Sequence, residues 1–127
     1  MLPGFLLPET TMREAGDGPV MELGELHGRL ILLTLGITRI IEQESLDLWV
    51  WGSVNGVDWG TKALTGFPQK FYCGTYQILV DLTAHPDVKF LRVKWNAQRW
   101  GKGDIRPLFG FYVFAQEMKH EMLAVGA

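Results

Sequence analysis

The segment from Leu46 to Trp59 constrains the fold of this chain more than any other. Aliphatic residues alternate in its first half with an acidic residue and two tryptophans. In an extended chain this puts Leu46, Leu48 and Val50 on one side and Asp47, Trp49 and Trp51 on the other. A period of two is typical of a β-strand that buries one face. The Asn55-Gly56 pair that follows predicts a turn, because both residues tolerate a positive φ. The first expectation is therefore a strand with large aromatic rings on the face away from the core.

Most of the chain repeats this pattern of short strands between turn signals. The expected strands are Val20–Glu25, Arg29–Ile37, Leu46–Val54, Thr75–Leu82, Val88–Trp95 and Leu108–Gln116. The first two are expected to pair around His27-Gly28, whereas 60–72 is interpreted as irregular chain and 101–107 as a loop. Strands and turns at this close spacing predict an all-β fold, an antiparallel β-sandwich of jelly-roll-like topology.

The two ends of the chain differ from this pattern. Residues 1–19 are rich in Gly and Pro and are expected to form an N-terminal arm. Because Phe5, Leu6 and Leu7 are apolar, the arm is expected to dock on its own domain or on a neighbour. The β-sandwich domain is assigned to 20–116, and 117–127 to a short helix and a C-terminal tail.

Composition narrows the class of protein. A chain of 127 residues suffices for one domain with its own core. Its net charge of −2 argues against a nucleic-acid partner or an acidic membrane surface. A single cysteine, Cys73, excludes an intramolecular disulfide. The apolar N-terminus lacks an early Lys or Arg and is interrupted by Pro3 and Pro8. We therefore expect no signal peptide, no membrane span and cytoplasmic synthesis, with a virion or other assembly as a later location.

A series of motifs follows in fixed order between residues 20 and 116. The motifs are Leu30–Thr38, Leu46–Ser53, a Gly-x-x-Trp turn from Gly56 to Trp59, Phe67, Phe90–Trp95 and Phe109–Val113. Their order and spacing resemble those of small β-sandwich proteins encoded among the structural genes of tailed phages and prophages. The resemblance implies a virion- or tail-associated structural role.

Part of the same series is similar to a second family. Gly52-Ser53, the turn from Gly56 to Trp59, and Lys89–Val93 resemble motifs of discoidin-like (coagulation factor 5/8 type C) jelly-roll domains. The chain is shorter than those domains and lacks the first third of their pattern and their terminal cysteine pair. The ligand loops of that family therefore do not carry over, and the resemblance implies a sandwich, with sugar binding as an analogy.

The face opposite the predicted core carries aromatic and cationic residues where a solvated sheet normally has Thr, Lys, Glu or Gln. This candidate interaction face consists of Trp49, Trp51, Phe90, Arg92, Lys94, Tyr112 and Phe114. Three coverings fit such a face: the chain's own arm or C-terminal helix, another subunit, or sugar rings stacked on the aromatic side chains.

A second candidate site is the loop after the fifth expected strand. Its candidate ligand residues are Arg99, Trp100, Lys102, Asp104 and Arg106. A Trp in such a loop can stack on a sugar, pack on a partner or fold back on its own sheet, and Arg can bind a carboxylate or phosphate with two hydrogen bonds. Trp59, in contrast, is expected to close the end of the sandwich.

The sequence shows no pattern typical of catalysis. Glu117, His120 and Glu121 have helical spacing, for which a solvated helical face is favoured over a metal site. No residue set predicts a nucleophile, a phosphate loop or a cofactor site. We expect a non-catalytic structural or interaction protein that binds itself or other subunits of an assembly, with a carbohydrate-binding module as the alternative.

Overall fold

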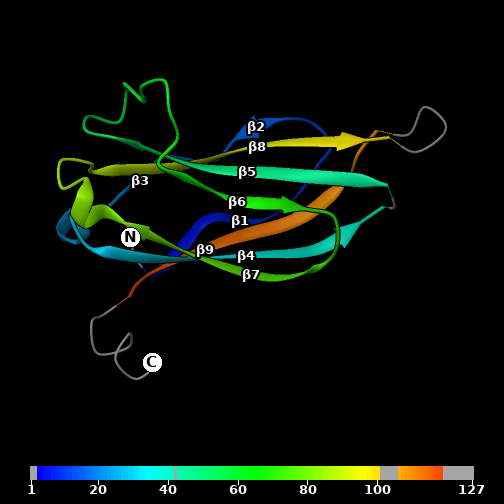
Figure 1. Ribbon diagram of the computed structural model, residues 1–127, viewed down its shortest axis with the longest axis horizontal. Coiled ribbons are helices and arrows are strands. Elements are labelled where there is room, and N and C mark those ends of the chain that lie inside the picture. Colours follow the sequence, from blue (N-terminus) through cyan, green and yellow to red (C-terminus); the bar gives the residue numbers. More distant parts are fainter. Residues whose placement is uncertain (1–2, 42, 101–105, 119–127) are drawn as a thin grey trace.

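Two antiparallel sheets packed face to face make up the computed structural model, which describes residues 3–41, 43–100 and 106–118 (Figure 1). Sheet A has the order β1 (Gly4–Met12), β9 (Phe109–Glu117), β4 (Leu30–Ile40), β7 (Gly74–Asp81). Sheet B has the order β2 (Gly16–Asp17), β8 (Phe90–Arg99), β5 (Glu44–Ser53), β6 (Thr65–Lys70), and β3 (Met21–Glu22) also pairs with β8. The helices among the described residues, η1 (Gly24–Leu26) and η2 (Leu82–Ala84), are single 3₁₀ turns, far too short to cross a membrane.

The strand order is that of a jelly roll. Strands β2 and β3 run one after the other along the same edge of β8, so they act as one interrupted strand. Each sheet then has four strands, and the chain crosses repeatedly between the sheets. The predicted all-β antiparallel sandwich is confirmed. The predicted C-terminal helix is not observed: Glu117 ends β9, and 119–127 lie outside the described residues.

The core lies between the sheets and is built by alternate residues of each strand. The residues that alternate along the strands with the predicted interaction face, and are therefore expected to face inward, are all buried: Leu46, Leu48, Val50, Leu91, Val93, Trp95, Phe109, Phe111 and Val113. Trp95 of β8 meets Phe111 of β9 edge to face, with ring centroids 5.5 Å apart. The period of two therefore identified the buried face of these strands correctly.

The first expected hairpin is absent. Strand β3 pairs with β8 in sheet B, whereas β4 pairs with β7 and β9 in sheet A. The chain between them forms η1 and turns at Gly28, whose φ is +73°. Alternation identifies a strand and its buried face but not its partner, so adjacency in sequence was a poor guide here.

Three strands, β1, β2 and β6, lie where none was expected. Strand β6 falls inside 60–72, and Pro68 is tolerated because β6 is an edge strand. Strand β1 lies in the segment expected to be an arm and pairs with β9. Leu6 and Leu7 are buried in the core, so this segment packs on its own domain.

Gly36 of β4 allows a close contact on the outer face of sheet A. It lies opposite Tyr112 of β9, and a Cβ atom added at Gly36 would be 2.1 Å from the Tyr112 ring. The ring therefore lies directly over the Gly36 backbone, where no side chain fits.

Gly36→Ala is expected to destabilise the fold by about 1–3 kcal/mol, because the Tyr112 ring must move. Without this contact, alanine would stabilise a strand interior relative to glycine. A decrease in the free energy of unfolding would therefore point to the steric conflict with the ring. Chemical denaturation measures the free energy of unfolding. In a Tyr112→Ala background the same substitution should cost less, and an equal cost in both backgrounds would show that the ring is not the obstacle.

Candidate functional site

The residues of the predicted interaction face lie on two different outer faces. Trp49, Trp51, Phe90, Arg92 and Lys94 belong to β5 and β8 of sheet B, and Tyr112 and Phe114 belong to β9 of sheet A. All point away from the core, as expected, but from opposite sides of the sandwich. The alternation predicted which residues of each strand face away from the core. It carries no information about which sheet the strand joins.

The outer face of sheet B combines indole rings with cations. Trp49 is 40% exposed, and its ring edge lies against Gly66 of β6, where an added Cβ would be 2.8 Å away. The ammonium nitrogen of Lys94 lies 4.5 Å from the centroid of the Trp51 ring. This geometry is that of a cation–π contact, so one face of the Trp51 ring is occupied by the chain itself.

Arg92 is fixed on the same face. Its Nη2 and Nε atoms donate to the carbonyl oxygen of Gly18 at 2.9 and 3.2 Å. Its guanidinium carbon lies 5.3 Å from the centroid of the Trp59 ring. Trp59 is thus partly exposed beside Arg92 and does not close the core as predicted. Arg92 holds the β2–β3 segment and the Trp59 loop against sheet B.

The Trp59 loop is ordered by its own polar side chains. The Ser53 hydroxyl donates to the Asp58 carbonyl at 2.6 Å. The Asn55 side-chain oxygen accepts from the backbone N–H groups of Val57 and Asp58 at 2.9 and 2.8 Å. Gly56 has a φ of +79°, as the predicted turn requires.

The outer face of sheet A carries a second group of rings. Phe5 of β1 meets Tyr112 and Phe114 edge-on, with centroid distances of 5.8 and 5.2 Å. These rings line a hollow of about 340 Å³ together with Glu9 and Thr34. The N-terminal segment therefore covers part of this face, and Phe5 itself remains 50% exposed.

A third aromatic group lies at one end of the sandwich. Trp100 is 60% exposed and meets Phe71 edge-on at 5.9 Å, and Tyr72 lies beside Phe71. Together with Ile40, Gln43 and Glu44 they line a hollow of about 390 Å³. We call Phe71, Tyr72 and Trp100 the tip cluster. Sequence reasoning identified Trp100 alone; the adjacent Phe71-Tyr72 pair between two strands was the signal for the rest.

The predicted ligand loop is only partly brought together. Arg106 forms an ion pair with Glu14 at 2.8 Å and lines a different hollow from Trp100. Arg99 is the last residue of β8, and Lys102 and Asp104 lie outside the described residues. The structure therefore places Trp100, but not Arg106, in the tip hollow.

A buried carboxylate fixes the backbone beneath the tip cluster. Glu44 is 1% exposed, and its two carboxylate oxygens accept from the N–H groups of Ile41 and Leu108 at 3.0 and 2.8 Å. The N–H of Trp100 donates to the carbonyl of Gln43 at 3.0 Å. The turn before β5 is thus joined to both ends of the chain between β8 and β9. Sequence reasoning missed this role of Glu44.

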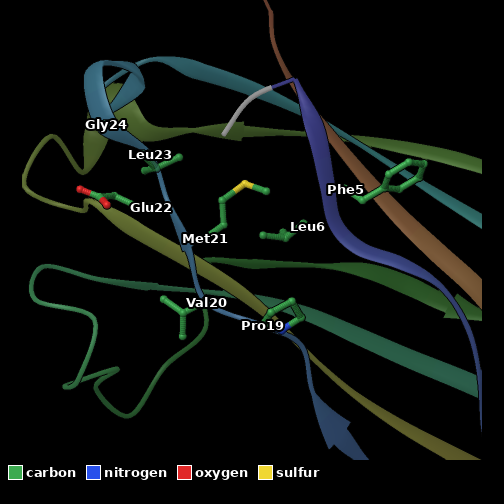
Figure 2. Close-up of a pocket in the computed structure, with 8 residues that line it drawn as sticks. All are labelled: Phe5, Leu6, Pro19, Val20, Met21, Glu22, Leu23 and Gly24. Carbon is green, nitrogen blue, oxygen red and sulfur yellow. The ribbon is translucent and has the colours of Figure 1, made fainter.

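A further hollow, between β1 and the β3 segment, is mainly apolar. It holds about 350 Å³, and Figure 2 shows Leu6 and Met21 near its middle, with the carboxylate of Glu22 pointing away. Within residues 3–41, 43–100 and 106–118, no three His, Cys, Asp or Glu side chains converge as metal ligands would. Glu117 forms an ion pair with Arg29 at 3.2 Å, and His120 and Glu121 lie outside those residues.

No protein-family model and no curated protein matches the chain. Among solved structures, it is similar to the K1 cleaved adhesin domain of Lys-gingipain from Porphyromonas gingivalis W83, at 15% identity and a TM-score of 0.46, over 89% of this chain and 66% of that chain. It is also similar to the K3 cleaved adhesin domain of Lys-gingipain, at 15% identity and a TM-score of 0.46, over 85% of this chain and 65% of that chain. A third similar structure is the VP2 subviral particle of infectious bursal disease virus, at 9% identity and a TM-score of 0.44, over 89% of this chain and 31% of that chain.

The chain spans less than two thirds of the length of each of these structures. At such identities and TM-scores they assign it no function. The resemblances to phage-type sandwich proteins and to discoidin-like domains remain predictions.

Glu44→Gln is expected to destabilise the fold by about 1–3 kcal/mol. The amide keeps one acceptor oxygen and turns an NH₂ group toward a buried backbone donor. Chemical denaturation checks this prediction. Glu14→Gln is the matched control, since the Glu14 side chain forms an exposed ion pair and its backbone is unchanged, and its effect should stay within about 0.5 kcal/mol. Equal effects of the two substitutions would refute the anchoring role of Glu44.

Proposed function

We propose that this chain is a non-catalytic structural domain that assembles with copies of itself or with other subunits through its aromatic outer surfaces. The observation that supports this function is the exposure of large rings on both sheets and at the tip, which include Trp49, Phe5 and Trp100. Solvated sheet faces normally carry polar side chains, and large exposed apolar groups are typical of interaction sites.

The outer face of sheet B is the principal contact surface in this proposal. Trp and Arg are the residues most enriched where interfaces gain their binding energy. Here Arg92 and Lys94 are already held by the Gly18 carbonyl and the Trp51 ring. A prearranged surface loses less conformational entropy when a partner binds. A place in a phage-type virion or tail assembly follows from the sequence resemblance alone.

Substituting Trp49→Glu together with Trp51→Glu should abolish assembly through this face while the monomer stays folded. Two carboxylates replace the rings that a partner would bury, which should weaken association by roughly tenfold or more. Light scattering after size exclusion measures the mass, and circular dichroism checks the fold. Thr11→Glu, at an exposed position of β1 in sheet A, is the control. An unchanged mass in the double variant would refute the role of this face.

A second candidate function is glycan binding at the tip cluster. Trp100 touches Phe71 only edge-on and remains largely exposed beside a hollow, which is the arrangement that sugar stacking needs. Trp51, in contrast, has Lys94 over its ring.

Trp100→Ala should remove glycan binding measured on an array or by titration calorimetry, because the stacking ring is lost. Trp49→Glu should leave such binding intact, since Trp49 lies outside the tip hollow. If wild-type protein binds no glycan across a broad panel, this second function is ruled out.

A further inference from the structure

The four outermost strands of the sandwich differ in how their free edges are protected. Strands β1 and β7 flank sheet A, and β6 and the β2–β3 segment flank sheet B. A free edge presents unpaired N–H and C=O groups to any other strand. Natural proteins block such edges with proline, charged side chains, bulges or short strand length.

Three of these strands carry such protection. Strand β1 contains Pro8 and Glu9 and has two shifts of register against β9. Strand β6 has six residues, among them Pro68 and Lys70. Strands β2 and β3 have two residues each and are separated by a stretch that contains Pro19.

Strand β7 lacks these devices. It has eight residues, Gly74 to Asp81, contains no proline, and pairs with β4 in an unbroken register. Its single charged side chain, Asp81, is the last residue. The Asp81 carboxylate accepts from the hydroxyl and the N–H of Thr83, and these hydrogen bonds lower its pKa. Figure 1 shows β7 along the rim of the sandwich, and no described strand pairs with its outer edge.

We propose that β7 pairs antiparallel with β7 of a second copy, about a two-fold axis at Gln77. The two A sheets would then join into one continuous eight-stranded sheet. The inference deepens the proposed function and relies on it for the existence of an assembly. It adds which strand makes one of the contacts and that the partner at this strand is the chain itself.

The sequence of β7 is compatible with itself in this arrangement. Residues that lie opposite one another in an antiparallel pair must point to the same side of the sheet. A two-fold axis at Gln77 places Gln77 opposite itself, Thr75 opposite Leu79, and Tyr76 opposite Ile78. No like charges face each other; Tyr76 with Ile78 combines a ring with a β-branched side chain, and Thr75 meets the aliphatic Leu79.

The neighbouring outer surface also fits a second copy. Leu79 is 42% exposed and lies beside Leu32 of β4 in the paired register. Gln77 donates to the Thr34 hydroxyl at 3.3 Å, so its uncharged side chain lies on the outer face beside β4. Lys70 lies over the Tyr76 ring at 3.9 Å, and Tyr76 packs against the core, so this cation lies on the side of β7 opposite the Gln77 side chain.

Mass measurement across a concentration series tests the inference on the full chain. Gln77→Lys and Gln77→Glu should each weaken self-association roughly tenfold or more, because each places like charges opposite each other across the axis. An equimolar mixture of the two variants should restore the dimer, which a folding defect could not do. Thr11→Lys, at an exposed position of β1 on the opposite edge of sheet A, is the matched control and should leave the mass unchanged.

Cross-linking tests the register. In a Cys73→Ser background, Gln77→Cys should form a disulfide-linked dimer under mild oxidation, because opposed residues in antiparallel strands lie within disulfide reach. Thr11→Cys in the same background, on the opposite edge of sheet A, should not.

Two results would overturn the inference: a wild-type protein that remains monomeric at every concentration, or a dimer that neither Gln77 variant weakens. The outcome is separable from that of the proposed sheet B contact. Trp49→Glu with Trp51→Glu should leave the β7 dimer intact, so loss of assembly in that variant alone would support the sheet B face and reject β7.

Discussion

Trp95 stabilises the point at which the chain first passes from sheet A to sheet B. Its ring packs edge-on against Phe111 of the opposite sheet, and its indole N–H donates to the carbonyl of Glu14 at 2.9 Å. Gly16 makes this approach possible, since an added Cβ there would be 2.7 Å from the indole. A single buried side chain therefore joins the two sheets and satisfies a backbone group of the crossing segment, and the position of β2 depends on it.

Alternation of apolar residues was sufficient to predict the sandwich and the inward faces of β5, β8 and β9, because burial of one face imposes the period of two. It could not assign strand partners. Hence β3 was paired with the wrong strand, and Tyr112 was placed on the same face as Trp49 although their strands lie in different sheets. Strand β6 was not predicted because Gly66 and Pro68 are residues typical of turns and loops, although this short edge strand tolerates them. The anchoring of loops by Glu44 depends on tertiary contacts that no local pattern reports.

The two outer faces of the sandwich have different chemical character. On sheet B, cations and indole rings alternate across β5 and β8, and Trp51 and Lys94 already contact each other. On sheet A, Glu9 lines the hollow beside Phe114, whereas Gln77 and its outer-face neighbours Leu79, Leu32 and Thr34 are uncharged. A charged aromatic face suits a partner of different composition, whereas an uncharged face can meet an identical one without repulsion. The fold thereby offers two kinds of contact on one small domain.

The hydrogen bonds between Arg92 and the Gly18 carbonyl would couple the binding of a partner at Arg92 to the edge segment that contains Gly18. An acidic group that binds Arg92 through its Nε and Nη2 atoms competes with that carbonyl, which accepts from the same two atoms. The N–H of Gly18 donates to the Val93 carbonyl at 2.7 Å, so loosening of the segment would expose a backbone pair at the sheet edge. Binding of an acidic group at Arg92 and release of the Gly18 segment from β8 would then be thermodynamically linked. Each event would change the free energy of the other by the same amount.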